Sequence, residues 1–401
     1  MTKSPTNPKT CVIIVENLPV PFDRRVWQEA NALKDAGWGV CVICPQNDKF
    51  PEPYVCLNGI HIYRHSLPVE ARGKIGFFLE YAFALFHEFR LLIKIYKKHG
   101  FTVIQACNPP DLIFLVVWPF TLCGKKFVFD HHDICPELFA VKFNRKGLLY
   151  QAMLFFEKIT YRLADRVVTA NDTFRSLCVG RTGKAVDAVI SVYSIPDHQN
   201  MHRVSPRADL KQEKQILIGY IGIIGTQDGV DHLVHAIAHL KYDMGVTDLR
   251  AVIIGDGPDL QAIKALAVDL KVAADIEFTG YLSGETLMAT LSTIDIGVIP
   301  DPYNEYNDKI SMNKVFEYSK LGIPIASYSL QETLRLLGDA VEVAPHHDYK
   351  GLAMAINRLR DDSYRKEMGQ KALNRAAHSF SWEIEKKKYV GVFEDLISRQ
   401  D

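Results

Sequence analysis

The sequence lacks the glycine-rich loops of the commonest nucleotide-binding proteins. No G-x-G-x-x-G motif follows the first strand-like run, VIIVENLPVPFDRR, and no Walker A motif occurs in the 401 residues. The nearest glycine series, Gly219-x-x-Gly222-x-x-Gly225, has a different spacing and lies in the second half of the chain. Dinucleotide oxidoreductases and P-loop NTPases use such loops to hold phosphates, so both classes lose their main support.

The sequence also lacks a continuous run of about 20 apolar residues, the length that a membrane-spanning helix needs. The stretch Phe77–Lys98 is largely apolar or aromatic, but two glutamates, a histidine and an arginine interrupt it. Leu112–Cys123 is too short to span a membrane and contains Pro119. The polar start of the chain, TKSPTNPK, has no apolar region of the secretory type. We therefore expect a cytoplasmic protein.

The stretch Phe77–Lys98 leaves two interpretations open. Its basic residues gather towards the end, as Lys94, Lys97 and Lys98. One interpretation is a core helix of the first domain. The other is a helix that lies on the inner surface of the membrane, with aromatic side chains inserted and lysines near the headgroups. Peripheral membrane contact is thus a second expectation for the location.

Cysteine usage favours reduced thiols over a redox or zinc site. Cys41-x-x-Cys44 has a suitable spacing, but no second pair accompanies it. If GVCVICP is one strand, these two side chains also point to opposite faces. The eight cysteines are scattered, and several lie inside apolar runs. We expect reduced core thiols.

Length and composition indicate a soluble globular protein of two domains. A chain of 401 residues exceeds one ordinary core, and its 48% hydrophobic and 23% charged residues are ordinary values. The net charge is zero, but residues 1–198 carry a surplus of Lys and Arg and the remainder a surplus of Asp and Glu. A basic half favours an anionic surface or substrate. We expect no nucleic-acid partner.

Short apolar runs alternate with amphipathic segments twice along the chain. The runs are CVIIVEN, GVCVICP, GIHIYRH, TVIQACN, KFVFDHH, RVVTAN and AVISVYS, then ILIGYIG, LRAVIIGDG, DIEFTGY, IGVIP, IPIASYS and VEVAP. Such strands are typical of parallel sheets with helices on both faces. The pattern predicts an α/β fold of two Rossmann-like domains, residues 1–198 and 215–378, with a polar linker at 199–214. A helical segment at 379–401 has no strand after it.

The segment NDKISMNKVFEYSKLGIP, residues 307–324, carries the strongest chemical signal. It follows the strand IGVIP, and we expect a helix that starts near Ser311, with Glu317 one to two turns later. Loop amides and a helix N-terminus form an anion site suited to a diphosphate, and a carboxylate can accept hydrogen bonds from vicinal ribose hydroxyls. The alternative is an ordinary amphipathic helix with a serine N-cap.

The run MNKVFEYSKLGIPI resembles the donor-site helix of glycosyltransferase family 4, whose members are retaining, metal-independent enzymes of GT-B fold. Other runs resemble successive segments of that family: VFDHHDICPEL, LADRVVTAN, GYIGIIGTQDGVDHLVHA, VIIGDGPD, IEFTGYLSGE, DIGVIPDPYNEYNDKISMNKVFEY and FSWEIEKKKYVGVFE. Their order along most of the chain makes the resemblance specific, and the chain is similar to bacterial polysaccharide-biosynthesis members. It implies a GT-B fold, with two parallel sheets facing across a cleft and the last helix returning to the first domain.

The resemblance also implies roles for residues that match the family's motifs. His132 matches the histidine that faces the donor sugar, with Asp133 and Glu137 nearby, and Asn17–Arg25 fall in the loop that the acceptor approaches. The donor-binding positions are Glu317 at the ribose, Ser311, Met312, Asn313 and Lys314 at the pyrophosphate, Tyr281 and Leu282 at the base, and Gly222 and Gly225 under the diphosphate.

Two positions depart from the family pattern. Lys309 stands where the first glutamate of the E-x7-E motif is expected, and the family's Arg/Lys pair is absent from GIIGTQDGVD, where Ile223 and Asp228 stand. We expect Lys309 or Lys314 to replace that pair and to act in catalysis, with Lys314 the better candidate. The alternative is that both lysines point into solvent, as most lysines do.

His132 has two other interpretations. A histidine at a strand end is often only a hydrogen-bonded structural residue. The run His131-His132-Asp133 also suggests a metal, but no second cluster has ligand spacing, and adjacent strand residues face opposite ways. We favour a role facing the sugar, because strand ends line the ligand crevice in this architecture. We expect no metal and no cofactor besides the donor substrate.

The sequence therefore predicts a retaining glycosyltransferase that uses a UDP-sugar or a GDP-sugar as donor. The acceptor is expected to be a saccharide or a lipid-linked molecule in cell-surface polysaccharide or glycolipid synthesis. Two alternatives remain open: a nucleotide-sugar epimerase of GT-B fold, and a non-catalytic nucleotide-sugar binding protein. An epimerase would act on the donor alone, and a binding protein would leave it unchanged.

Overall fold

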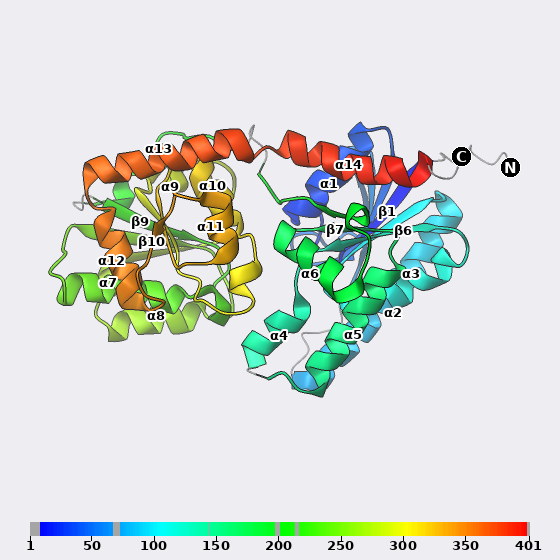
Figure 1. Ribbon diagram of the computed structural model, residues 1–401, viewed down its shortest axis with the longest axis horizontal. Coiled ribbons are helices and arrows are strands. Elements are labelled where there is room, and N and C mark those ends of the chain that lie inside the picture. The colour runs from blue at the N-terminus through cyan, green and yellow to red at the C-terminus, as the bar shows by residue number, and fades with distance from the viewer. Residues whose placement is uncertain (1–8, 67–72, 144, 197–200, 213–215, 399–401) are drawn as a thin grey trace. The chain divides into compact units, whose positions relative to one another are not determined.

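The structure is a computed structural model. It describes all residues except 1–8, 67–72, 144, 197–200, 213–215 and 399–401, and it does not describe the side chains of residues 73–81. The chain forms two compact units (Figure 1). Unit 1 consists of Met1–Ser194 and Glu383–Asp401, and unit 2 of Ile195–Trp382. The chain therefore passes between the units twice, and unit 1 contains both ends of the described chain.

Unit 1 is built on an eight-stranded sheet of order β3-β4-β2-β1-β5-β6-β7-β8. All its strands pair in parallel except β3, which runs antiparallel to β4 at the edge. The strands are β1 (Thr10–Ile14), β2 (Gly39–Pro45), β3 (Tyr54–Leu57), β4 (Ile60–His65), β5 (Val103–Cys107), β6 (Lys126–His131), β7 (Arg166–Thr169) and β8 (Val189–Ser191). The strand order reverses between β1 and β5, the place where sheets of this kind bind ligands.

Helices cover both faces of this sheet because its strands are apolar on both sides. The helix α1 starts after Asp23, whose carboxylate accepts a hydrogen bond from the amide of Val26, and ends before Gly37, which has a φ of 84°. The helices of unit 1 are α1 (Arg24–Asp35), α2 (Gly73–Lys98), α3 (Phe114–Thr121), α4 (Cys135–Phe143), α5 (Leu148–Leu163), α6 (Asp172–Thr182) and α14, which begins at Trp382 and ends at Ser398.

The last helix, α14, packs on unit 1. Lys386 forms an ion pair with Asp35 of α1 at 3.0 Å, and the rings of Phe393 and Trp38 meet edge to face with centroids 5.7 Å apart. Tyr389, in the middle of the helix, is fully buried and donates a hydrogen bond to Gln105 Oε1 in β5. The helix thus closes the face of the sheet that α1 also covers.

Unit 2 contains a six-stranded parallel sheet of order β11-β10-β9-β12-β13-β14. Its order reverses between β9 and β12. The strands are β9 (Ile216–Ile221), β10 (Leu249–Ile254), β11 (Ile276–Gly280), β12 (Ile296–Ile299), β13 (Ile325–Ser327) and β14 (Glu342–Val343). The helices are α7 (Val230–Tyr242), α8 (Leu260–Asp269), α9 (Gly284–Thr293), α10 (Asn313–Lys320), α11 (Gln331–Leu337), α12 (Tyr349–Arg358) and α13 (Asp362–Ser379).

Residues 201–212, the described part of the segment expected to be a linker, are held against unit 2. Arg203 Nε donates to the carbonyl of Leu321 at 2.7 Å, and its Nη1 donates to the carbonyl of Ser292 at 3.1 Å. Leu210 in this segment is also buried. The composition is polar, but these polar groups bind backbone carbonyls of the domain that follows.

The helix α2 contains the stretch Phe77–Lys98, for which a core helix and a membrane-surface helix were both considered. Its side chains are described from residue 82 onward, and some fit the first interpretation and some the second. Leu92 and Ile95 belong to the core of unit 1, whereas Phe83 and Phe86 are 49% and 60% exposed. Lys97 is exposed too. Among the described residues, no helix is long and apolar enough to cross a membrane.

The cysteines carry no disulfide. Cys41 and Cys44 are buried in β2, and burial raises the pKa of both thiols, to about 12 and about 11 respectively. Cys44 Sγ accepts a hydrogen bond from the amide of Val20 at 3.4 Å. Two of the eight, Cys56 and Cys123, are exposed, so the prediction of core thiols does not hold for them.

Candidate active site

Lys314 lies at the point where the strand order of unit 2 reverses. Its Nζ donates to Asp301 Oδ2 at 2.6 Å and lies 4.6 Å from the ring centroid of Tyr220. Asp301 follows β12 and Tyr220 belongs to β9, so the cation is held at the carboxyl ends of the two strands that flank the reversal. The side chain is only 8% exposed, which contradicts the alternative that it points into solvent.

Asp301 is the counter-ion of this lysine. Burial raises the pKa of its carboxyl group, and the charge of Lys314 opposes that shift. Within the described residues, Lys314 is the cation that Asp301 contacts. The ion pair fixes the ammonium group in place, because a buried charge is stable only with a partner.

The helix α10 starts two residues later than expected. The N-cap is Met312, which makes no side-chain capping bond, and Asn313 is the first helical residue. Ser311 is therefore not an N-cap, and its Oγ donates to Glu332 Oε2 at 3.3 Å. No acidic residue lies in the first turn of α10, where Lys314 stands. A helix start without a capping side chain and with a cation in its first turn suits an anion.

Glu317 and Tyr318 follow one turn into α10. The hydroxyl of Tyr318 donates to the carbonyl of Gly219 at 3.0 Å and accepts from the amide of Ile221 at 3.1 Å. Both partners belong to β9, so this tyrosine fixes the helix against the central strand. Glu317, its neighbour, is only 2% exposed. Its assignment to the ribose of the donor stays a prediction.

Glycines bring the loops after β9 and β10 into backbone contact. A Cβ atom on Gly255 would lie 1.8 Å from the carbonyl oxygen of Gly222, and one on Gly257 would lie 2.3 Å from that of Ile224. The amide of Ile224 also donates to the carbonyl of Asp256 at 3.0 Å. These two loops therefore form one compact backbone layer, in which larger residues have no space.

The loop after β9 contains the two positions where the family's cations are missing. Ile223 is 65% exposed, whereas Asp228 Oδ2 accepts a hydrogen bond from the amide of Gly225 at 3.0 Å. Asp228 thus closes a turn of the loop and has a structural role. The same turn is tied to the loop before α10, because Asn307 Nδ2 donates to the carbonyl of Gln227 at 2.9 Å.

The remaining predicted donor residues lie on the same edge of the sheet. Lys309 ends a short 3-10 turn, Asn307–Lys309, and is half-buried. Tyr281 and Leu282 directly follow β11, and Tyr281 is 51% exposed. All predicted donor-binding residues of unit 2 thus lie at the carboxyl ends of its strands, or in the loop or helix that follows a strand.

In unit 1, His132 directly follows β6. Asn108 organises the loop: its Oδ1 accepts from the amides of His132 and Asp133 at 2.8 and 3.2 Å, and its Nδ2 donates to Asp111 Oδ1 at 2.9 Å. The imidazole Nε2 lies 2.7 Å from Asp130 Oδ2, and the side chain is 15% exposed. His132 is therefore fixed at both its backbone and its ring while it keeps some accessible surface.

Asp130 is the centre of a buried network on the face of the sheet that α1 and α14 cover. Arg25 Nη2 donates to its Oδ1 at 2.7 Å, and Gln105 Nε2 donates to its Oδ2 at 3.1 Å. Burial opposes ionisation, but the charge of Arg25 and the hydrogen bonds from His132 and Arg25 outweigh it and lower the pKa of Asp130. Arg25 also forms an ion pair with Glu29 at 3.1 Å, so two carboxylates share its charge, whereas the described contacts of Lys314 include one carboxylate, that of Asp301.

The opposite face of β6 carries a second network, in which the side chains of His131 and Glu157 are fully buried. His131 lies between the hydroxyl of Tyr161, at 3.1 Å, and Glu157, at 3.7 Å. Arg181 Nη1 donates to Glu157 at 2.7 Å, and its Nη2 donates to Glu137. Burial lowers the pKa of His131 to about 3 and raises that of Glu157 to about 8. Glu137 is therefore held in this structural network.

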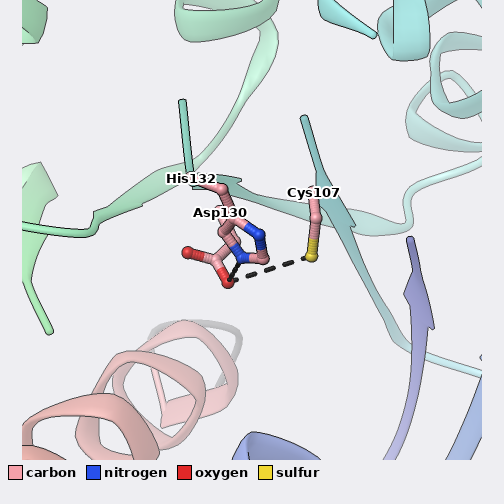
Figure 2. Close-up of side chains that lie close together, drawn as sticks. All are labelled: Cys107, Asp130 and His132. Carbon is pink, nitrogen blue, oxygen red and sulfur yellow. Dashed lines mark hydrogen bonds and ion pairs between the residues drawn. The ribbon is translucent and has the colours of Figure 1, made fainter. Parts of the chain in front are cut away.

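Cys107, Asp130 and His132 lie close enough to share a metal ion, as Figure 2 shows. Their chemistry does not favour one. Asp130 Oδ2 already accepts hydrogen bonds from Arg25 Nε at 3.3 Å and from Gln105, and a second cation there would face the guanidinium charge. Burial also raises the pKa of the Cys107 thiol, whereas metals bind the thiolate. The group is better described as a hydrogen-bonded cluster.

Two family models match the chain in the order of its units. The model described as "Glycosyl transferase 4-like domain" matches residues 23–192, and that described as "Glycosyl transferases group 1" matches residues 203–375. The chain belongs to glycosyltransferase family 4.

Curated relatives of this family 4 chain match part of their length. A 2-deoxystreptamine glucosyltransferase of Streptomyces kanamyceticus is 27% identical over 165 residues, which are 40% of this chain and 41% of that protein. An MMP alpha-(1->4)-mannosyltransferase of Mycolicibacterium hassiacum is 27% identical over 176 residues, 43% of this chain and 41% of that protein. The aligned segments thus span less than half of each relative.

Solved structures show the GT-B fold over nearly the whole family 4 chain. Sucrose-phosphate synthase of Thermosynechococcus elongatus superposes with a TM-score of 0.79 at 16% identity and covers 98% of this chain and 100% of that one. The Anabaena protein HepE, in complex with UDP and glucose, superposes with a TM-score of 0.71 at 13% identity. The match covers 96% of this chain and 100% of HepE. The predicted fold class is therefore confirmed.

Several residues of the two sites give little signal in the sequence. Asp301 and Tyr220, which hold Lys314, lie inside runs that resemble the family, but the resemblance assigned no role to either residue. Asp130 and Arg25 were missed as partners of His132, although a carboxylate inside the apolar run KFVFDHH is unusual enough to be noticed. A charged residue in a buried strand needs a buried partner, so the sequence could have indicated that Asp130 has one, although not that it is Arg25.

Proposed function

We propose that this chain is a retaining glycosyltransferase, which moves a sugar from a UDP-sugar or a GDP-sugar to a saccharide or lipid-linked acceptor in cell-surface polysaccharide or glycolipid synthesis. The observation that carries the proposal is the buried cation of Lys314, in the first turn of α10, where the strand order of unit 2 reverses. Open α/β sheets bind ligands at that point, and a cation beside a helix start suits a diphosphate. The family assignment and the relatives that are named for sugar transfer support it.

In the proposed reaction, the acceptor hydroxyl oxygen bonds to the anomeric carbon on the face that the nucleoside diphosphate leaves. The bond between that carbon and the diphosphate oxygen breaks, and a phosphate oxygen takes the acceptor's proton. Lys314, Lys309 and the amides at the start of α10 supply positive charge to the leaving oxygens, so the proposal requires no metal. Glu317 binds the ribose of the donor.

The test is to incubate the purified chain with a panel of UDP-sugars and GDP-sugars, first alone and then with saccharide and lipid-linked acceptors. We expect the donor to be consumed, and a glycosylated product with retained anomeric configuration to form, only when an acceptor is present. Conversion of the donor to another nucleotide sugar without an acceptor would instead indicate an epimerase. Binding without any turnover would indicate a non-catalytic protein.

Replacing His132 by Ala is expected to lower turnover far more than it weakens binding of the free nucleoside diphosphate. Its proposed partner is the donor sugar, which the free nucleotide lacks. Turnover with the best donor and nucleotide affinity by calorimetry check this. As a matched control, His232→Ala removes a half-buried histidine whose ring bonds to Tyr328 in unit 2. Equal losses in turnover and nucleotide affinity for His132→Ala would assign His132 a structural role.

We also propose peripheral contact with the inner surface of a membrane through α2 and its neighbour α3. Phe83 and Phe86 of α2 are exposed, and so are Leu115 and Trp118 of α3, at 49% and 51%. The two helices are in contact. Aromatic and aliphatic side chains that are exposed together on neighbouring helices favour an interfacial role over a purely internal one.

Changing Lys94, Lys97 and Lys98 to Glu is expected to abolish binding to anionic liposomes. Each such cation contributes about 1 kcal/mol near an anionic surface, so a triple reversal removes most of the electrostatic attraction. Lys94 and Lys98 also lie near the ring of Tyr63, with Nζ to centroid distances of 5.6 and 5.9 Å, so folding must be verified by circular dichroism. Co-sedimentation measures the effect.

The control for this prediction has the same change of charge in unit 2. Lys271, Lys350 and Lys366 are exposed, and their change to Glu is expected to leave liposome binding intact. If the triple variant of α2 still co-sediments like the wild type, α2 is simply a core helix with an exposed face.

A further inference from the structure

His132 Nε2 and Asp130 Oδ2 are 2.7 Å apart, a distance that requires one proton between them. An ionised carboxylate can only accept hydrogen bonds. Asp130 is ionised next to Arg25, which donates to both of its oxygens. The proton must therefore be on Nε2 of His132, because the other tautomer would bring two lone pairs together.

The other ring nitrogen of His132 is then the one that can meet a ligand. In the neutral Nε2–H tautomer, Nδ1 carries a lone pair and accepts hydrogen bonds. Nδ1 has no hydrogen-bond partner within the part of the chain that the structure describes, and Figure 2 shows it turned away from the carboxylate. His132 is 15% exposed, whereas the Asp130 side chain is fully buried.

The carboxylate of Asp130 is itself held in one orientation. Arg25 Nη1 is anchored by the carbonyl of Val192 at 2.7 Å, which directs its other nitrogens to Asp130. Gln105 Oε1 accepts from the hydroxyl of Tyr389, so its Nε2 must face Asp130 and Glu29, at 3.1 and 2.7 Å. The Gln105 amide cannot be turned round, because the ionised carboxylate of Asp130 only accepts hydrogen bonds and would then face the amide oxygen.

We propose that Asp130 is a positioning residue that holds His132 in the Nε2–H tautomer, so that the lone pair of Nδ1 accepts a hydrogen bond from a hydroxyl of the donor sugar. Arg25, Gln105 and Tyr389 fix the carboxylate in the orientation that this requires. The hydrogen bond between Nδ1 and the donor sugar rests on the proposed function. The tautomer of His132 and its control by Asp130 do not.

The experiment is nitrogen-15 NMR of the histidine rings in the full chain, with the signals of His132 assigned from a His132→Gln variant. We expect a protonated Nε2 and an unprotonated Nδ1 in the wild type at neutral pH. In Asp130→Asn, donors of Arg25 and Gln105 face both ends of the amide, so neither amide orientation suits all of them and Nε2 loses its fixed acceptor. We expect the Nδ1 and Nε2 signals to shift towards those of a mixture of the two tautomers. A protonated Nδ1 in the wild type, or Nδ1 and Nε2 signals that stay unchanged in a folded Asp130→Asn variant, overturns the proposal.

Tyr389→Phe is the second variant, in case Asp130→Asn does not fold. It removes one hydroxyl and frees Gln105 to rotate, and we expect a change in the His132 ring signals. The matched control is Tyr161→Phe, another fully buried tyrosine, which contacts His131 on the opposite face of β6. Equal effects of the two variants on the His132 signals would overturn control of His132 through Tyr389.

Kinetics distinguish this proposal from the proposed function. With a working donor, Asp130→Asn is expected to lower kcat about tenfold, the scale for one hydrogen bond, with the affinity for the free nucleoside diphosphate unchanged. If no donor supports transfer while the tautomers behave as described, the proposed function fails and the positioning role stands. An unchanged kcat in a folded Asp130→Asn variant overturns the role towards the sugar.

Discussion

Replacing Lys314 by Met is expected to reduce turnover about a hundredfold, the scale for removing one group that stabilises charge in the transition state. The leaving nucleoside diphosphate gains negative charge as the sugar bond breaks. The helix start alone supplies about half a positive charge, which is too little for a dianion. Lys314 Nζ is held at the carboxyl ends of β9 and β12, and Met keeps its length while removing its charge. Turnover of the best donor measures the effect.

Lys320→Met is the matched control for this variant. Lys320 is a second buried lysine of the same helix, 9% exposed, and it donates to the carbonyl of Pro196. We expect turnover close to that of the wild type in a folded Lys320→Met protein. Lys309→Met, in the preceding turn, tests the other candidate cation. Wild-type turnover in both Lys314→Met and Lys309→Met would contradict the proposal and direct attention to Arg24, which is exposed, because Arg25 is engaged with Asp130.

Replacing Glu317 by Ala is expected to weaken the binding of the donor and of the free nucleoside diphosphate together, because the ribose is common to both. The loss of one or two hydrogen bonds to a carboxylate corresponds to about 2–4 kcal/mol. Glu317 is buried in α10 next to Tyr318, which fixes the helix to β9. Isothermal titration calorimetry with UDP and with GDP measures both affinities.

Glu342→Gln provides the control for Glu317. Glu342 is a buried glutamate in β14 of the same unit and is 4% exposed. Its carboxylate accepts a hydrogen bond from the hydroxyl of Tyr364 at 2.6 Å. It is expected to change thermal stability but not nucleotide affinity. A folded Glu317→Ala protein with unchanged affinity would remove Glu317 from the proposed site.

Most of the fold could be predicted because its strands are short, apolar and bounded by polar or glycine-rich turns. Every strand-like run that the sequence indicated is a strand in the structure. The strand β3 was missed because, at the edge, its residues are largely exposed and show no buried face. Local sequence also placed the start of α10 two residues early, since Ser311 looks like an N-cap but bonds to Glu332 of α11 instead.

The candidate sites were predictable only where their residues are neighbours in the sequence. Lys314 and Glu317 share one helix, so a single motif indicates both. The partners of His132 come from distant segments: Arg25 is 105 residues away from Asp130, and Tyr389 is 284 residues away from Gln105. No local pattern connects such pairs, because only the tertiary packing of α1 and α14 on the sheet brings them together.

The position of α14 in unit 1 has a consequence for how the protein is made. Unit 1 consists of Met1–Ser194 and Glu383–Asp401, so its sheet is synthesised long before the helix that completes it. Until Tyr389 leaves the ribosome, the carbonyl of Gln105 lacks the hydroxyl that fixes it in the finished fold. Unit 2, by contrast, is complete in one stretch and can fold as the chain emerges. His132 therefore acquires its final surroundings only after α14 has been synthesised and has packed on unit 1, and not when β6 is made.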